Sequence, residues 1–117
     1  MLTVSEGRRY FLSKTPADMR KGFDGLCGVI RQESGSNPLS GDIFIFLNKR
    51  RNQIKLLLWE GDGFSLYHKR LERGTYELPV INLSDVSVEV KAQDLLLILQ
   101  GISLQHIRKR PRYTHSI

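Results

Sequence analysis

Cysteine is nearly absent from this sequence of 117 residues, in which Cys27 is the single one. One thiol excludes an intramolecular disulfide and any zinc site built from several cysteines. Cys27 lies in an apolar stretch, so we expect it to pack as a small hydrophobic side chain and not to act as a reactive thiol. Histidine is also rare. The three histidines, His68, His106 and His115, are too far apart in the sequence to match the spacing of a zinc site.

Long hydrophobic runs are missing as well. Even the run Leu95–Leu99 is far shorter than the roughly 20 residues that a membrane-spanning helix needs. The N-terminal segment reaches Arg8 and Arg9 before any long apolar run, which is not the pattern of a secretory signal peptide. Glycine-rich motifs for phosphate or dinucleotide binding are absent too. We therefore expect a cytoplasmic protein with no membrane partner and no cofactor.

Acidic residues are outnumbered, with 12 Asp and Glu against 18 Lys and Arg, which gives a formal net charge of +6 and a pI near 9.8. The excess is unevenly distributed along the chain. Residues 48–73 contain seven basic residues and three acids, and residues 106–117 contain four basic residues and no acid. Residues 74–105, by contrast, contain one Lys and four acids. Segregated positive charge of this kind favours a polyanionic partner such as nucleic acid.

The hydrophobic pattern predicts an α+β fold: a single domain with a small, mostly antiparallel β-meander sheet and one or two packed helices. Three apolar segments separated by turns form the meander. The predicted strands are Ile43–Leu47, Gln53–Trp59 and Phe64–Lys69, with two more at Arg9–Leu12 and Val86–Val90. Apolar residues on both faces of segment 53–59 predict the central strand, covered by a helix on at least one side. The domain is expected to span residues 1–105, followed by a flexible basic tail at residues 106–117.

A helix is predicted to start at Thr15 and Pro16, because threonine can cap a helix and proline suits its first position. Asp18 then occupies the position at which a carboxylate commonly caps the start of a helix. The helix is expected to end near Glu33, before a cluster of helix-breaking residues. Its apolar face repeats at helical spacing through Met19, Phe23, Leu26 and Ile30.

Glycines at positions 22, 25 and 28 weaken this helix. They indicate either close packing against another backbone or a helix that begins only near Gly22. A second helix is predicted at Asp94–Gln100 with Gly101 at its C-cap, although a strand fits the same residues. The predicted core contains Phe23, Leu26, Ile30, Ile43, Ile45, Leu56, Leu58 and Leu66.

Carboxylates for metal-assisted phosphoryl transfer are the first candidate chemistry. The available acids are Asp18, Asp24, Asp42, Glu60, Asp62 and Glu72. Asp62 lies between two glycines in a turn, and Glu72 is flanked by Arg70 and Arg73 and is expected to be ion-paired, so both have structural explanations. Tyr113 lies among basic residues, as in a recombinase, but the surrounding tail lacks the hydrophobic frame that holds a rigid phosphate clamp. We expect no catalytic residue and no metal site.

A nucleic-acid-binding surface is the better-supported candidate. In a meander, the first turn and the end of the third strand fall at the same end of the sheet, so two basic clusters converge there. They are Lys49, Arg50 and Arg51 in the turn, and Lys69, Arg70 and Arg73 after the strand. The basic tail adds Arg108, Lys109 and Arg110. Contacts are expected mainly to phosphates, with Trp59, Tyr67 and Tyr76 available to stack on bases or simply to pack. The competing interpretation is an ordinary solvated hairpin tip.

Several blocks of the sequence also resemble a known family. Asp18–Leu26 reads DMRKGFDGL, Asn37–Phe46 reads NPLSGDIFIF, and Lys55–Phe64 reads KLLLWEGDGF, continued by Tyr67–Gly74. In order and spacing these blocks resemble the TnpB-type accessory protein, the second open reading frame product of bacterial insertion sequences of the IS-sixty-six type. The resemblance covers roughly residues 8–80, and Leu96–Ile102 is similar to a late Leu-Leu-x-Gly segment of that family.

This resemblance implies a protein encoded beside a separate acidic-triad transposase and needed together with it. It implies no catalytic residue in this chain. We therefore expect a non-catalytic accessory protein of transposition that binds DNA or helps to assemble the transposase complex. The alternative is a protein-interaction module that binds the transposase without contacting DNA. Clustered basic groups at one sheet end favour the first hypothesis, and a large exposed apolar patch favours the second.

Overall fold

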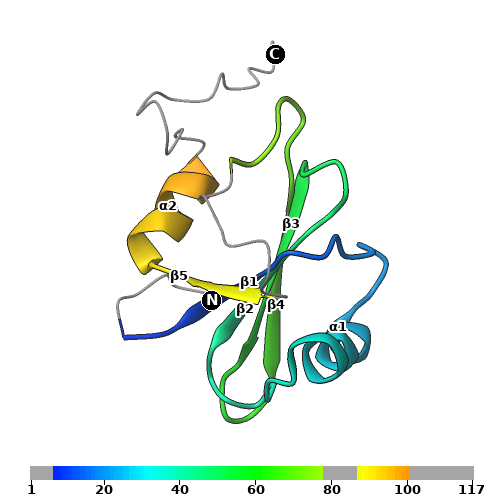
Figure 1. Cartoon of the computed structure of the whole chain (residues 1–117), viewed down its shortest axis with the longest axis vertical. Coiled ribbons are helices and arrows are strands. Elements are labelled where there is room, and N and C mark those ends of the chain that lie inside the picture. The colour runs from blue at the N-terminus through cyan, green and yellow to red at the C-terminus, as the bar shows by residue number, and fades with distance from the viewer. Residues whose placement is uncertain (1–6, 78–86, 101–117) are drawn as a thin grey trace.

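The computed structural model describes residues 7–77 and 87–100, which form a five-stranded sheet with helices on both faces (Figure 1). The strands are β1 (Tyr10–Ser13), β2 (Ile43–Leu47), β3 (Gln53–Trp59), β4 (Phe64–Arg70) and β5 (Ser87–Val90). Their order in space is β4-β3-β2-β1-β5. Among these five strands of the described ranges, β1 and β2 pair in parallel and the other neighbours are antiparallel. The predicted α+β class and the β2-β3-β4 meander are therefore confirmed.

The middle of this sheet is β2, so the prediction that β3 is the central strand is wrong. β3 lies between β2 and β4, while β1 adds in parallel to the other side of β2. Parallel neighbours need a crossover connection, which here contains the first helix, so this pairing is not local in sequence. Both β2 and β3 are nonetheless interior strands and are buried on both faces.

One face of the sheet carries the larger core, which helix α2 (Ala92–Gln100) covers. Leu56 and Ile45 occupy opposite positions on neighbouring strands of this face, and both are buried. Leu95 and Ile98 of α2 pack against the same cluster. Of the two interpretations of residues 94–100, the helix is confirmed, because these leucine and isoleucine positions repeat at helical spacing toward the core.

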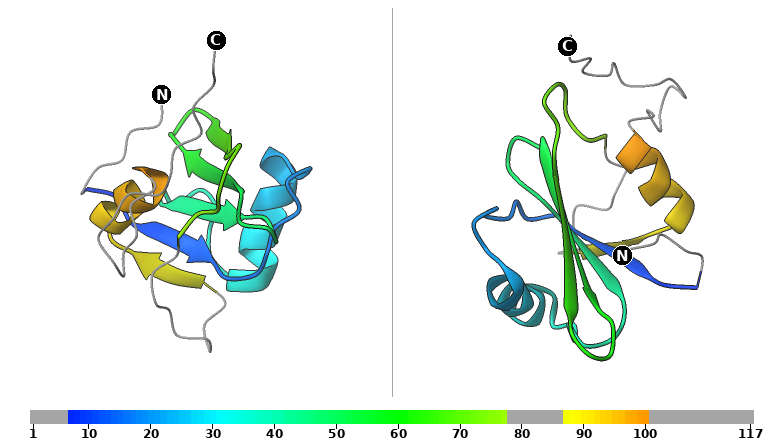
Figure 2. Two further views of the ribbon diagram at one scale, coloured as in Figure 1. Left: turned by 90° about the horizontal axis from the view of Figure 1, so that it is seen from above. Right: turned by 180° about the vertical axis from the view of Figure 1, so that it is seen from behind.

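The other face is covered by helix α1 (Phe23–Val29), which lies opposite α2 across the sheet (Figure 2). Leu57, the neighbour of Leu56, points to this side because successive side chains of a strand alternate between faces. Leu26 and Cys27 of α1 pack against it. Cys27 is thus a buried core residue, as predicted, and burial raises the pKa of its thiol.

The chain does not start a helix at Thr15 and Pro16, so that prediction is wrong. Residues 14–22 form a loop, and the Ala17 N–H donates to the carbonyl of Leu47, 2.8 Å away at the end of β2. Asp18 does not cap a helix; its carboxylate accepts the backbone N–H of Arg20 at 2.9 Å, which closes a tight turn. The helix begins after Gly22, which is the second of the two explanations for the glycines.

The end of this helical segment follows the prediction closely. After α1 the backbone widens into a π-helical turn, η1 (Ile30–Ser34), in which the Ser34 hydroxyl donates to the Ile30 carbonyl at 2.7 Å. Gly35 then adopts φ +64°, the left-handed conformation that commonly ends a helix.

The predicted core is confirmed for six residues: Leu26, Ile30, Ile43, Ile45, Leu56 and Leu58. Leu66 is only partly buried, at the margin of the cluster under α1. Phe23 was predicted to be buried and is 47% exposed, because it opens the first turn of the shortened helix. The predicted C-cap at Gly101 and the tail at residues 106–117 lie outside the described residues.

Candidate nucleic-acid interface

Two basic segments lie together at one end of the sheet. In the β3-β4 ladder Gln53 pairs with Arg70, and beyond it the Leu71 N–H donates to the Asn52 carbonyl at 2.7 Å. The Tyr76 N–H donates to the Arg51 carbonyl, also at 2.7 Å, so the chain after β4 folds back against the β2-β3 turn. We call this cluster the basic end and define it by Lys49, Arg50, Arg51, Lys69, Arg70 and Arg73.

The β2-β3 turn is held rigidly by asparagine side chains. Asn48 accepts the N–H groups of Asn52 and Gln53 at 3.0 and 2.9 Å, and its amide donates to the Asn52 side chain at 2.6 Å. Arg51 adopts φ +59°, a left-handed conformation that is uncommon for any residue except glycine. The exposed cations of this turn are therefore carried by an ordered backbone, which lowers the entropy lost when they bind an anion.

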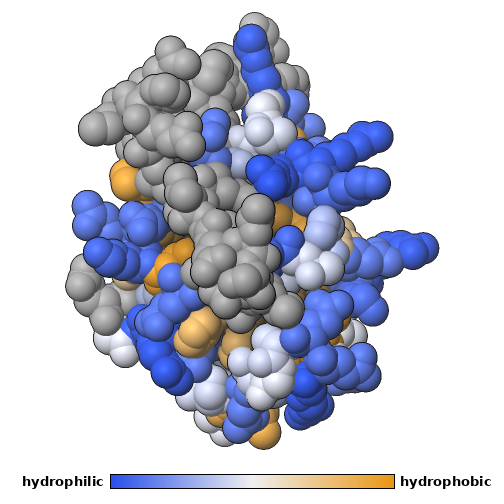
Figure 3. Space-filling view, in the orientation of Figure 1, coloured by the Kyte–Doolittle hydropathy of each residue, from blue (hydrophilic) through white to orange (hydrophobic). Residues whose placement is uncertain are grey.

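Most cations of the basic end have no acidic partner. Arg70 pairs with Glu72 at 2.8 Å, and both side chains are more than half exposed. No ion pair to the other five cations occurs within residues 7–77 and 87–100. Long hydrophilic side chains project from the same region of the surface, at the upper right of Figure 3. Unpaired, exposed cations on one end are what phosphate binding requires.

The opposite end of the sheet has a different charge balance. Asp42 directly precedes β2 there and accepts two hydrogen bonds from the Arg9 guanidinium, at 3.0 and 3.1 Å. Glu60 and Asp62 lie in the β3-β4 turn, at the bottom of Figure 1, and neither forms an ion pair in the described part of the chain. Acids at this end are thus balanced against Arg8, Arg9 and Lys91, whereas cations exceed acids at the basic end.

Sequence reasoning missed Lys55, a buried cation beneath this surface. The residue is 6% exposed, and its ammonium donates to the carbonyls of Met19 and Lys21 at 2.7 Å each. No carboxylate pairs with it in the described ranges. The available signal was a single lysine inside the otherwise apolar segment 54–59, where a buried charge needs specific hydrogen-bond partners.

Replacing Lys55 with Met is expected to lower the free energy of unfolding by about 1.5–3 kcal/mol, because two carbonyls lose a charged donor. Relief from burying a charge offsets only part of that cost. Urea denaturation measures the change, and Lys91→Met, at an exposed lysine, should stay within about 0.5 kcal/mol of the parent protein. A Lys55→Met variant as stable as the parent would show that these hydrogen bonds do not hold the loop.

The aromatic residues that lie near the basic clusters in sequence pack elsewhere and do not line the basic end. Tyr76 is 2% exposed and belongs to the core under α2, so it packs and does not stack. Trp59 is at the far end of β3, where it meets Phe64 edge-on with ring centroids 4.9 Å apart. Tyr67 also packs against the core. These three aromatic side chains of the described ranges are thus poorly placed to stack on bases beside the basic end.

His68 and Gln53 mark the side of the basic end that faces α1. The His68 ring nitrogen Nε2 lies 2.9 Å from the Gln53 side-chain oxygen. Burial, followed by the positive charges of Lys55 and Arg70, lowers the pKa of His68. The lowered pKa favours the neutral form of this histidine, so the positive charge of the surface comes from its Lys and Arg side chains.

The residues considered for catalysis do not come together as an active site in the described ranges. No group of three or more His, Cys, Asp or Glu side chains comes together there as a metal would need. Of the carboxylates considered, Asp18 pairs with Arg20, Asp42 with Arg9, and Glu72 with Arg70. Tyr113 and the tail cations Arg108, Lys109 and Arg110 lie outside the described residues.

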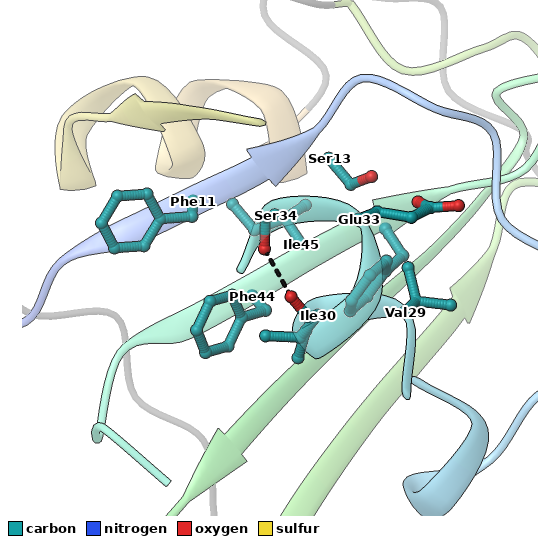
Figure 4. A pocket seen from close by; sticks show the side chains of 9 residues that line it. Phe11, Ser13, Val29, Ile30, Glu33, Ser34, Phe44 and Ile45 are labelled. Atoms are coloured by element: carbon teal, nitrogen blue, oxygen red, sulfur yellow. Dashed lines mark hydrogen bonds between the residues drawn. The ribbon is translucent and has the colours of Figure 1, made fainter. Parts of the chain in front are cut away.

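A small cavity between η1 and the sheet is lined mainly by apolar side chains (Figure 4). Phe11, Phe44 and Ile30 form part of its wall, and Phe11 stacks on Phe44 with centroids 6.0 Å apart. Its volume of about 20 Å³ admits a single water molecule and is far below that of a small-molecule site. None of the helices in the described ranges combines the length and apolarity needed to span a bilayer.

Comparison with known proteins gives a family match over most of the chain. The model of the family described as IS66 Orf2 like protein matches residues 8–109. Two uncharacterized proteins of Sinorhizobium fredii (strain NBRC 101917 / NGR234) are similar to the chain. One, y4jC, is 28% identical over 111 residues, which cover 95% of this chain and 93% of the relative. The other, y4hO, is 28% identical over 114 residues and covers 97% of each chain. No solved structure matches.

Proposed function

This chain belongs to the family of IS66 Orf2 like proteins, and on that premise we propose that it is a non-catalytic accessory factor of insertion-sequence transposition that binds duplex DNA through its basic end. The transposase of the same element is its proposed protein partner. The family supports the role in an insertion sequence, and the surface supports the DNA contact. The contact is with the phosphate backbone, so affinity depends weakly on base sequence.

The observation that carries this proposal is the convergence of two cationic segments at one sheet end. The hydrogen bonds from Leu71 to Asn52 and from Tyr76 to Arg51 hold these segments together. Five of the six cations there have no ion pair in the described ranges, so they are available to phosphates without first breaking one. The acids Glu60 and Asp62 lie at the other end, which disfavours DNA contact there.

The alternative, a module that binds only the transposase, calls for a contiguous apolar patch. Phe23, Leu39 and Leu96 are the large hydrophobic side chains most exposed in the described ranges, at 47%, 45% and 41%. They belong to α1, the loop before β2, and α2. Since α1 and α2 cover opposite faces, Phe23 and Leu96 do not belong to one patch, which favours the DNA-binding proposal.

A titration of fluorescent duplex carrying the element-end sequence tests the proposal, at salt concentrations from about 50 to about 200 mM. If all five unpaired cations contact phosphates, the log–log slope of affinity against salt should be near −4.5, from about −0.9 per contact. A scrambled duplex should bind almost as tightly. Absence of duplex binding at the lowest salt, together with capture of the purified transposase, would instead support the protein-interaction module.

The purified chain is expected not to cleave DNA strands and not to bind a divalent metal tightly. Neither Asp42 nor Asp62 belongs to a group of three or more His, Cys, Asp or Glu side chains that could hold a metal ion in the described ranges. Incubation of supercoiled plasmid with Mg²⁺ or Mn²⁺ measures nicking. Metal-dependent nicking that disappears in Asp42→Ala or Asp62→Ala would contradict the non-catalytic role.

A further inference from the structure

The loop before α1 lies at the same end of the sheet as the β2-β3 turn. We infer that residues 18–22 form a second phosphate-contacting arm of the DNA surface, in which Lys21 contacts a phosphate and Asp18 restrains Arg20. This inference rests on the proposed function, since it adds residues to the same surface. It assigns a role to part of the sequence block Asp18–Leu26, which contains none of the six cations that define the basic end.

The loop is attached to the sheet at two points. The Ala17 N–H donates to the carbonyl of Leu47, the last residue of β2 and the one before the β2-β3 turn. Lys55 holds the loop from below through its two hydrogen bonds to Met19 and Lys21. Both attachments place the loop beside the turn that carries Lys49, Arg50 and Arg51, on the face that α1 covers.

The other side of the turn is occupied by the chain after β4. Leu71 and Tyr76 pack against the core under α2, so this segment lies on the opposite face of the sheet from the loop. The β2-β3 turn is thus flanked on both sides by backbone that carries cations, Lys21 on one face and Arg73 on the other. This arrangement allows contacts with phosphates on both sides of the turn.

The charges in the loop are not equally available. Lys21 is exposed and forms no ion pair in the described ranges. The Arg20 guanidinium instead binds the Asp18 carboxylate through three contacts of 2.8–3.1 Å. Its side chain is 91% exposed and that of Asp18 is 41% exposed, so solvent screens the pair and its net stability is small. A DNA phosphate can therefore compete with Asp18 for the same guanidinium.

The state of this pair is constant at neutral pH. Hydrogen bonds from the Arg20 side chain, and then from its backbone N–H, lower the pKa of Asp18 to about 2. The carboxylate is consequently always ionised when DNA binds, and it opposes phosphate contact both by occupying Arg20 and by repulsion. Beneath the loop, the charge of Lys55 adds positive potential that no carboxylate in the described ranges neutralises.

Asp18→Asn tests the inference through a gain of binding. The amide oxygen can still accept the Arg20 N–H and keep the turn, while the negative charge is lost. We expect duplex binding to tighten by about five- to ten-fold at about 100 mM salt, with a slope steeper by about 0.9, since one more cation contacts phosphate. Lys21→Glu should weaken binding and make the slope shallower by about one unit.

Lys91→Glu is the matched control, because it makes the same charge change at an exposed lysine next to β5, at the opposite end of the sheet. It should change the affinity for duplex DNA by less than about two-fold, because Lys91 is farther from the basic end than the distance over which salt screens a charge. A loss for Lys91→Glu equal to that for Lys21→Glu would mean that only net charge matters, and the inference would be wrong.

The outcomes separate the inference from the proposal beneath it. Failure of the parent protein to bind duplex would overturn the proposed function itself. Unchanged affinity in both Asp18→Asn and Lys21→Glu, with weakened binding in Arg50→Glu/Arg51→Glu, would overturn only the role of the loop. If Lys21→Glu does not fold, Asp18→Asn still decides the question, because a gain of affinity in a variant that melts like the parent protein does not come from misfolding.

Discussion

Reversing Arg50 and Arg51 to Glu together is expected to weaken duplex binding by about 60-fold at about 100 mM salt, because two phosphate contacts at about 0.9 each are lost. The salt dependence should become shallower by about two units on the log–log scale. Both side chains are exposed in the rigid β2-β3 turn and carry no ion pair in the described ranges. The loss should be the same for element-end and scrambled duplexes, since phosphates carry no sequence information.

Two controls make this result specific. The double reversal Arg31→Glu/Lys91→Glu makes the same charge change at exposed residues outside the basic end and should leave binding nearly unchanged. Arg51→Gly removes one cation and relieves the φ of +59°, so binding should fall while stability is kept or raised. Melting temperatures should barely move in the charge variants, because exposed charges contribute little to stability. Equal binding by the parent protein and Arg50→Glu/Arg51→Glu would remove this surface from the proposal and bring the protein-interaction module forward.

Leu56→Ala is expected to lower the free energy of unfolding by about 2–5 kcal/mol, as deletion of a fully buried leucine side chain does. Leu56 is 0% exposed in the interior strand β3, between Ile45 of β2 and Tyr67 of β4. The substitution leaves a cavity between two neighbouring strands, within the core that α2 covers. The surrounding structure cannot easily collapse to fill it.

Urea denaturation of the purified protein measures this loss from the shift of the transition midpoint at constant slope. Leu39→Ala is the matched control, since Leu39 is 45% exposed and the same truncation there should cost about 0.5 kcal/mol. A loss below about 1 kcal/mol for Leu56→Ala would be incompatible with an interior position for this strand.

The strands of the meander were predictable because their signals are local. The segment 53–59 reads as one apolar run bounded by turn residues, and the bounds of β3 agree with it. Short turns between consecutive apolar segments enforce antiparallel pairing, which brings the two ends of the hairpins together. For the same reason, the sequence alone predicted that Lys49–Arg51 and Lys69–Arg73 meet at one end of the sheet.

The first helix was predicted too long because its apolar spacing continued beyond the helix itself. Met19 and Phe23 fit the periodicity of Leu26 and Ile30, yet the backbone before Gly22 satisfies its hydrogen bonds with the end of β2 and with Lys55. Spacing alone cannot distinguish a helix from a loop whose polar groups are bonded elsewhere in the fold. Phe23 is left at the exposed first turn for that reason.

The sequence by itself determined the fold class, the meander and the charge segregation, since each of these depends on residues close together along the chain. The tertiary structure alone decided that β1 pairs in parallel beside β2, that Lys55 is buried, and that the loop at residues 18–22 lies next to the β2-β3 turn. These features join segments about 30 residues or more apart. They arise where strand ends and buried polar groups must find hydrogen-bond partners, and no local pattern of hydrophobicity or charge specifies which distant partner they take.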